Sequence, residues 1–399
     1  MRILYVSQYF PPEIGAPAVR VSQLVQRWRE WGHDVRVLTG FPNHPDGVVP
    51  LEYRPKLRRL VMEERWRDVP VYRTWLYPTP NRGLTRRSAS YMSFGMSAAL
   101  TGALLRFKPE VVIGTSPQLL CAGAAYFIAK RFGARFVFEV RDLWPESLSA
   151  VGAAQPTSLL YRGLASTADW LYRGADQVVA VTDASRDQIV SKGISPDKVA
   201  VVRNGVDTDS ISATTPSPSD KFTICYIGAI GMAHALETAI DAAKLLRGEP
   251  DVRFVFVGGG AERETLQRKA RDANLSNVEF RGPRPWSEVP QILAESDACL
   301  VHLARAPLFE TVLPSKMFEA MAAGRPIILG VLGEAQRLLA EAGAGLAIEP
   351  ESAEQLRDAV LTLYRDRELG QTLGRSGRLY AEREASYEAR ARQYLERLS

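Results

Sequence analysis

The chain repeats one pattern twice, in which short apolar runs alternate with segments of helical spacing. In the first half such runs occupy 2–7, 32–40 and 111–116, and in the second half they return at 222–228 and 252–258. Short apolar strands separated by helices are typical of parallel sheets that carry helices on both faces. The pattern therefore predicts an α/β fold with two doubly wound, Rossmann-like domains.

The boundary between the two halves is marked by a change of composition. Residues 210–220, SISATTPSPSD, are rich in serine, threonine and proline, which is typical of a linker. We therefore expect an N-terminal domain over 1–205 and a second domain over 206–377. Residues 378–399 are interpreted as a charged helix that packs back towards the first domain. Ligands of such folds bind at the carboxyl ends of the strands, so the two domains are expected to face a central cleft.

Composition narrows the chemistry that this chain can perform. With 399 residues, 46% of them hydrophobic and 24% charged, it has the make-up of an ordinary soluble protein. The first residues enter a strand without the apolar stretch and cleavage site of a signal peptide. The cysteines at 121, 225 and 299 stand far apart and offer neither a disulfide framework nor zinc-ligand spacing. We expect a reduced, cytoplasmic protein that uses no metal and no cofactor.

The net charge of +5 hides an asymmetry between the halves. Residues 1–205 hold 27 Lys and Arg against 17 Asp and Glu, a net charge of +10, so the remaining residues carry −5. Most of the excess lies in 54–87, where ten basic residues accompany three acidic ones, interleaved with tryptophans and tyrosines. Such a segment suits an anionic membrane surface, a phosphorylated substrate or single-stranded nucleic acid.

The segment that follows, 88–105, contains no charged side chain over 18 residues. Its length reaches the lower limit of a membrane span, but its many Ser, Ala and Gly residues favour a buried core helix. Together with the basic segment before it, this run predicts a protein that lies peripherally at the inner face of the cell membrane and does not cross it.

One short segment, 313–327 (LPSKMFEAMAAGRPI), places a lysine and a glutamate among small and apolar residues. Its signals predict a helix that starts near Pro314, is capped by Ser315 and ends at a glycine. A lysine in the first turn adds to the attraction of a helix N-terminus for anions, and small residues allow close approach. Lys316 and Glu319 therefore form either an exposed ion pair or a site for phosphate and hydroxyl groups.

Glycines follow the first strand of each predicted domain. Gly228 and Gly231, in YIGAIG, leave backbone N–H groups that can cradle a phosphate, and Gly15 is the matching glycine of the first domain. The glycine run 258–260 lacks the rest of a dinucleotide-binding motif and is interpreted as a tight turn. The sequence shows no Ser-His-Asp or Cys-His set for nucleophilic catalysis.

Taken in order, seven stretches resemble the GT-B-fold, retaining glycosyltransferases of family 4 over nearly the whole chain. They are SQYFPPEIGAPAVR, GHDVRVLT, TSPQLL, EVRDLWPES, VVRNGVD, YIGAIG and LPSKMFEAMAAGRPI. The resemblance is greatest to the subgroup that builds bacterial surface polysaccharides (O-antigen and capsule), which includes N-acetyl-L-fucosamine transferases.

The resemblance implies a donor site in the second domain. In this family the glutamate before the AMA stretch, here Glu319, binds the ribose hydroxyls of a nucleotide-sugar. A basic residue and the helix N-terminus hold the diphosphate, a role that Lys316 and the Ser315 backbone match. Gly15, Gly228 and Gly231 are assigned to donor binding as well.

Several positions of the donor site depart from the family pattern. The family places another glutamate eight positions before the one on the helix; here Thr311 occupies that position and Glu310 lies one step out of register. The arginine and lysine of the glycine loop are replaced by Ala229 and His234, and Arg284 is expected to supply the missing charge.

The resemblance also implies catalytic residues. The histidine of the family's His-Asp pair, near the acceptor, becomes Arg141 beside Asp142 in this chain. We take Asp142, Arg141 and Glu310 as candidate catalytic residues, and Thr311 and Arg284 as further donor-binding residues.

These implications predict a retaining glycosyltransferase that moves a sugar, expected to be an N-acetyl sugar, from a UDP-sugar to a polyprenyl-diphosphate-linked saccharide. The departing diphosphate gains negative charge, which Lys316, Arg284 and two helix N-termini would stabilise without a metal. A UDP-N-acetylglucosamine 2-epimerase of the same fold is an alternative, and it needs cleft carboxylates for acid–base chemistry. A nucleic-acid-binding protein that uses 54–87 is another, but it leaves two α/β domains unexplained, so no nucleic-acid partner is expected.

Overall fold

The computed structural model describes residues 1–398 apart from 14, 45–46, 81–83, 151–154 and 213–220. The chain divides into two compact units, one formed by Met1–Asn204 with Arg390–Ser399 and the other by Gly205–Ala389. Most of the expected linker at 210–220 lies outside the described residues.

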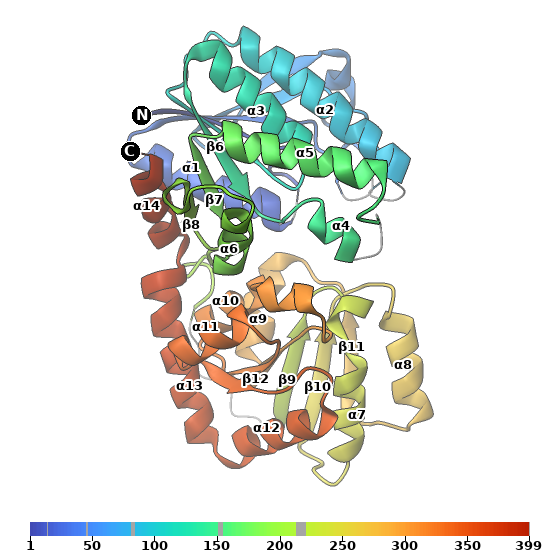
Figure 1. Ribbon diagram of the computed structural model, residues 1–399. Helices are drawn as coiled ribbons and strands as arrows, with labels where there is room; N and C mark the ends of the chain where they lie inside the picture. Colours follow the sequence, from blue (N-terminus) through green and yellow to red (C-terminus); the bar gives the residue numbers. More distant parts are fainter. Residues whose placement is uncertain (14, 45–46, 81–83, 151–154, 213–220, 399) are drawn as a thin grey trace. The chain divides into compact units, whose positions relative to one another are not determined.

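The first unit is built on one eight-stranded sheet in the order β3-β4-β2-β1-β5-β6-β7-β8 (Figure 1). Its strands are β1 Arg2–Val6, β2 Asp34–Gly40, β3 Val61–Trp66, β4 Val69–Thr74, β5 Val111–Thr115, β6 Arg135–Val140, β7 Gln177–Ala180 and β8 Val199–Val201. Neighbouring strands run parallel except β3 and β4. These two form an antiparallel hairpin through a tight turn in which Arg67 adopts a φ of 50°. This hairpin was not predicted from the sequence, because the charged residues 63–65 interrupt the apolar pattern of β3.

Helices cover both faces of this first sheet. They are α1 Ala16–Glu30, η1 Arg54–Arg58, α2 Leu84–Leu104, α3 Leu119–Phe132, α4 Glu146–Ala150, α5 Leu159–Gly174, α6 Asp183–Ser191, η2 Pro196–Lys198 and α14 Tyr387–Leu398. Figure 1 shows α2, α3 and α5 side by side, and their buried residues share one core with the sheet. On the other face α1 packs against α14, where the Trp28 and Tyr394 ring centroids lie 5.3 Å apart and Trp28 Nε1 donates to the Ala391 carbonyl.

The second unit is built on a six-stranded, fully parallel sheet in the order β11-β10-β9-β12-β13-β14. Its strands are β9 Phe222–Ile227, β10 Val252–Val257, β11 Val278–Gly282, β12 Ala298–His302, β13 Ile327–Gly330 and β14 Gly345–Ala347. Its helices are η3 Met232–His234, α7 Glu237–Leu245, α8 Arg263–Asp272, η4 Trp286–Glu288, α9 Val289–Ala294, η5 Pro307–Thr311, α10 Ser315–Ala322, α11 Glu334–Ala342, α12 Ala353–Arg365, α13 Arg367–Tyr380 and η6 Ala381–Ala385. One core joins the sheet to α7, α8 and α12, and another joins it to α9, α10 and α11. The predicted α/β class, with two parallel-sheet domains, is therefore confirmed.

Two expectations about helices need correction. The single helix expected over 378–399 is interrupted, because α13 and η6 end at Ser386, which is extended, before α14 begins. The uncharged segment 88–105 does form a helix, α2, but only one side of it is buried. Within the described chain, no helix combines the length and the apolarity needed to cross a membrane.

Two glycine loops of the second unit lie unusually close together, at the carboxyl ends of β9 and β10. Gly228 N–H donates to the Val257 carbonyl, and Ile230 N–H donates to the Gly259 carbonyl. A Cβ atom added to Gly258 would lie 1.8 Å from the Gly228 oxygen, and Gly258 has a φ of 150°. The glycine run at 258–260 therefore serves close backbone packing, which agrees with its interpretation as a turn.

We expect Gly258→Ala to lower the free energy of unfolding by about 2–4 kcal/mol, because the loops must separate and the backbone must take a strained φ. Gly248→Ala is the matched control, since a Cβ there meets no atom within 4 Å. Urea denaturation of both variants tests this; equal stability of the two would show that the loops are not tightly packed.

Candidate functional site

Lys316 is tied to the glycine loop of the second unit through a tyrosine. Its Nζ lies 4.0 Å from the centroid of the Tyr226 ring and donates to Tyr226 Oη at 2.8 Å. Tyr226 Oη in turn donates to the Ala229 carbonyl at 2.6 Å. A Cβ added to Gly228 would lie 2.8 Å from the same Nζ. The ammonium group therefore sits directly beside the loop at the carboxyl end of β9. Tyr226 begins the YIGAIG motif, but no role was predicted for it from the sequence.

Glu319 lies one turn further along α10 and keeps its carboxylate free. Both Lys316 and Glu319 are half-buried, and no nitrogen–oxygen distance of 4 Å or less joins them. Across the described residues, no hydrogen bond to the Glu319 carboxylate is found. The alternative of an exposed ion pair is therefore wrong. The carboxylate has room to accept hydrogen bonds from another molecule.

Burial shifts the pKa values of Lys316 and Glu319 in the direction that favours the neutral form of each side chain. Burial lowers the pKa of Lys316 to about 8, and the Glu319 carboxylate only partly opposes the shift. Burial likewise raises the pKa of Glu319, with Lys316 opposing. Each charge is thus only partly compensated within the protein, which is typical of a binding site.

The histidine of the glycine loop supplies no positive charge. Burial and the nearby Lys316 lower the pKa of His234 to about 4, so it is neutral at pH 7. Its carbonyl lies 2.8 Å from Nδ1 of the buried His302, whose Nε2 lies 3.1 Å from the Glu351 N–H. His302 must therefore carry its proton on Nδ1 and accept at Nε2. A neutral histidine at 302, which the sequence analysis did not single out, thus holds the loop in place.

Other predicted donor-binding groups differ from the expectation. Ser315 does not cap α10; Pro314 is the N-cap, and Ser315 is the first helical residue and exposed. The reason is that the Pro314 carbonyl already accepts the Met317 N–H. The Gly228 N–H is bonded to the Val257 carbonyl and so cannot cradle a phosphate, whereas Gly231 lies in an open position.

Three further candidates follow other strands of the second unit, and none of the three forms a hydrogen bond or ion pair with Lys316. The exposed Arg284 faces Glu288 at 3.6 Å, after β11, which β10 separates from β9. Glu310 is exposed on η5, and its main chain packs against Gly333. Thr311 Oγ1 donates to the Leu308 carbonyl, so this hydroxyl is used locally.

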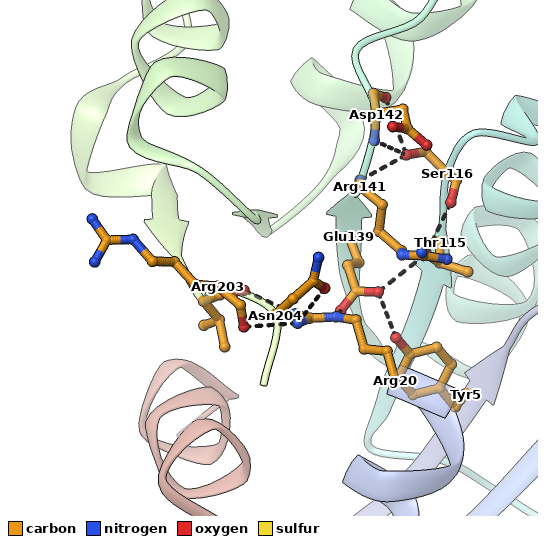
Figure 2. A network of polar contacts seen from close by, with 10 residues as sticks. Tyr5, Arg20, Thr115, Ser116, Glu139, Arg141, Asp142, Arg203 and Asn204 are labelled. Carbon is orange, nitrogen blue, oxygen red and sulfur yellow. Dashed lines mark hydrogen bonds and ion pairs between the residues drawn. The ribbon is translucent and has the colours of Figure 1, made fainter. Parts of the chain in front are cut away.

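The first unit carries a buried polar network at the carboxyl ends of its central strands (Figure 2). Arg20 Nε, from α1, lies 3.1 Å from Glu139 Oε2 on β6, and both side chains are fully buried. Tyr5 Oη and Thr115 Oγ1 donate to Glu139 Oε1 at 2.7 and 3.1 Å. Burial is the largest single influence and by itself would raise the pKa of Glu139. The charges of Arg20 and Arg141, with the hydrogen bonds from Tyr5 and Arg20, together outweigh it and hold this pKa below the usual range.

Arg141 and Asp142 follow β6 directly and are positioned by Ser116 from the neighbouring strand end. Both backbone N–H groups donate to Ser116 Oγ, at 2.8 and 3.3 Å, and Ser116 Oγ donates to the Asp142 carbonyl (Figure 2). Asp142 is exposed, and Arg141 is half-buried and helps to keep Glu139 ionised. Gly15 is the N-cap of α1, and a Cβ added there would meet Pro17 at 3.6 Å, an ordinary van der Waals distance. In the described part of the chain, no three His, Cys, Asp or Glu residues cluster as metal ligands.

Both units match known glycosyltransferase families. Residues 15–205 match the glycosyl transferase 4-like domain, and residues 207–380 match the glycosyl transferases group 1. The chain is 28% identical over 383 residues to the putative colanic acid biosynthesis glycosyl transferase WcaI of Escherichia coli K12, covering 89% of this chain and 90% of that protein. It is 27% identical over 283 residues to the probable glycosyltransferase WbjE of Pseudomonas aeruginosa, covering 68% and 70%.

Solved structures give the same fold. Sucrose-phosphate synthase from Thermosynechococcus elongatus superposes with a TM-score of 0.75 at 19% identity, covering 99% of this chain and 97% of that one. HepE of Anabaena, solved in complex with UDP and glucose, superposes with a TM-score of 0.71 at 18% identity, covering 100% and 99%. The protein is therefore a glycosyltransferase of the GT-B fold, composed of a glycosyl transferase 4-like domain and a group 1 domain.

Proposed function

We propose that this glycosyltransferase moves an N-acetyl sugar from a UDP-sugar to a polyprenyl-diphosphate-linked saccharide, with retention of the anomeric configuration, in bacterial surface polysaccharide synthesis. The acceptor places the enzyme peripherally at the inner face of the cell membrane. The relatives support the pathway, since their names refer to colanic acid biosynthesis or to glycosyl transfer. The choice of UDP is supported by the structural neighbour HepE, which was solved with UDP and with UDP-glucose.

The observation that carries the proposal is the free, half-buried carboxylate of Glu319 one helical turn from the Lys316 ammonium. A carboxylate accepts hydrogen bonds from two vicinal hydroxyls, as on a ribose, and an ammonium binds a diphosphate. The first turn of α10 adds backbone N–H groups without intrahelical partners. Nucleotide recognition is therefore assigned to α10 and the loop after β9, and Arg284, Thr311 and Gly231 are proposed to extend it.

Transfer requires stabilisation of the charge that develops on the departing diphosphate. In this proposal Lys316 provides it, and no protein nucleophile and no metal take part. Arg141, Asp142 and Glu310 are proposed to position the acceptor and the transferred sugar.

Incubation with UDP-N-acetyl sugars and a polyprenyl-diphosphate-linked saccharide should release free UDP and extend the lipid, and both should persist in EDTA. Chromatography of the nucleotides and mass spectrometry of the lipid measure the two products. Turnover that EDTA abolishes and Mg²⁺ or Mn²⁺ restores would contradict the metal-free mechanism. Interconversion of the UDP-sugars without release of UDP would contradict transfer.

Glu319→Gln should weaken UDP binding by about tenfold to a hundredfold, because hydrogen bonds to a charged acceptor are worth about 1.5–3 kcal/mol. Calorimetry measures this, with Glu341→Gln, an exposed glutamate of α11, as the control. If Glu319 binds the ribose, the penalty should shrink with 2′-deoxy-UDP. An unchanged affinity in Glu319→Gln would remove Glu319 from the donor site.

UDP affinity should fall as the pH rises from 7 to 9. The free protein loses the Lys316 proton near pH 8, while a bound diphosphate favours the ammonium form, so binding above pH 8 must recapture a proton. The loss should approach tenfold for each pH unit above 8 and should vanish in Lys316→Met. Lys221→Met, at an exposed lysine before β9, should keep the pH dependence of the unmodified protein. Calorimetry at several pH values tests this, and a fall that survives in Lys316→Met would assign it to another group.

A further inference from the structure

An unusual share of the exposed large apolar side chains lies on α2, α3 and α5. These three helices carry nine of the twenty such residues in the described chain, whereas the whole of Gly205–Ala389 carries four. The three helices lie side by side over one face of the first sheet (Figure 1). We call their outward side the helical face. Its apolar residues are too numerous to be the scattered exposed residues of an ordinary surface.

On α2 the exposed apolar residues form a continuous stripe. Met92, Met96, Leu100 and Leu104 are 54%, 72%, 69% and 78% exposed and follow each other at intervals of four residues. Residues four apart lie above one another on a helix, so the stripe follows the helix axis. The opposite side of α2 is buried in the core, which includes Phe94. The helix is therefore apolar on two sides, one packed into the core and one turned away from the protein.

Aromatic residues continue the helical face across α3 and α5. Phe127 of α3 is 59% exposed and Trp170 of α5 is 40% exposed, with their ring centroids 6.0 Å apart. Both pack around the half-buried Tyr126. Leu159, at the start of α5, is 84% exposed. Tryptophan at the edge of an apolar surface is typical of residues at the boundary between lipid and water.

The charges of the same helices have one predominant sign. The three helices contain six arginines and lysines but a single acidic residue, Asp169. Lys130, Arg131, Arg162 and Arg173 are exposed beside the apolar residues. Long basic side chains can lie along an apolar surface while their charged ends reach phosphate groups. A surface that is apolar in its middle and basic around it complements an anionic lipid layer.

We propose that the helical face docks this protein on an anionic phospholipid bilayer, with the α2 stripe and Trp170 inserted at the level of the headgroups. This inference rests on the proposed function, because an enzyme that uses a lipid-linked acceptor must reach it at the membrane surface. It assigns insertion to α2, α3 and α5, and leaves the exposed arginines of 54–59 an electrostatic role alone. Those arginines belong to η1 and the residue after it. The exposed leucines there, Leu51 and Leu60, flank this segment and lie nine residues apart, without the four-residue spacing found on α2.

Sedimentation of the full-length protein with vesicles of phosphatidylglycerol and phosphatidylcholine tests the proposal. Met96→Glu combined with Leu100→Glu should weaken binding by about tenfold or more, because two inserted side chains become charged. Leu245→Glu combined with Leu379→Glu introduces the same charges at exposed leucines of the second unit and should bind like the unmodified protein. Lys130→Gln with Arg131→Gln should weaken binding at low salt and make it less sensitive to salt.

Insertion itself has a separate measurement. Lipids brominated near the headgroup should quench tryptophan fluorescence of the unmodified protein, and Trp170→Phe should lose most of that quenching. Binding that survives Met96→Glu with Leu100→Glu, or that is lost only in Arg58→Gln with Arg59→Gln, would overturn the proposal. A dimer in lipid-free solution that the same glutamate substitutions dissociate would assign the helical face to a second copy of the chain instead.

Calorimetry with UDP on the same preparations separates this inference from the proposed function. Loss of vesicle binding with UDP affinity retained places the defect in the helical face alone. Vesicle binding by a protein that does not bind UDP would contradict the proposed donor and leave the docking surface standing.

Discussion

The buried ion pair between Arg20 and Glu139 is the constraint on which the carboxyl edge of the first sheet depends. It joins α1 to β6, and the hydrogen bonds from Tyr5 and Thr115 connect the two intervening strands, β1 and β5. A buried charge is costly unless it is paired and its remaining hydrogen-bonding capacity is filled. Here Glu139 accepts bonds from neutral donors as well as from Arg20, so the charges persist in the core.

The same arginine fixes the chain where it leaves the first sheet. Its terminal nitrogens donate to the carbonyls of Val202 and Arg203, at 2.9 Å each, and to Asn204 Oδ1 at 3.3 Å (Figure 2). Gly205, the next residue, begins the second unit. Because one guanidinium holds the helix, the strand ends and the exit of the chain, this network orders the segment that precedes the second unit.

The charged residues Lys316 and Glu319 of the second unit, unlike Arg20 and Glu139, are not paired with each other. Lys316 and Glu319 are half-buried near each other but do not form an ion pair. Among the described residues, Lys316 donates a hydrogen bond to the hydroxyl of Tyr226, whereas none is found for the Glu319 carboxylate. Leaving charges partly desolvated and partly unpaired costs stability, and proteins tolerate this cost mainly at binding sites. The carboxylate of Glu139 accepts hydrogen bonds from three side chains and has a structural role. The carboxylate of Glu319 has no such partner among the described residues and is available to a ligand.

Much of this protein could be predicted from the sequence, because its strands and helices depend on local apolar periodicity. The alternation of strands and helices, the α10 segment and the likeness to GT-B glycosyltransferases were all accessible without coordinates. The lack of charge and the Ser, Ala and Gly content also predicted a buried helix at 88–105. They could not show which side of α2 is covered, since that depends on where α3 packs. The hairpin of β3 and β4 was missed because three consecutive charged residues, 63–65, interrupt the apolar pattern of β3.

What only the tertiary structure decided is which polar groups meet. Lys316 and Gly228 are far apart in the sequence, and their contact arises because the start of α10 lies against the carboxyl end of β9. Tyr226 begins the YIGAIG motif and His302 belongs to no motif. In neither case did a local pattern mark the tyrosine as the partner of Lys316 or the histidine as the support of the glycine loop. The sequence by itself determined the elements and the types of residue at their ends, because those depend on local patterning. Whether the Glu319 carboxylate is free and whether the Gly228 N–H is bonded depend on residues that are distant in the sequence. Folding alone brings such residues close in space.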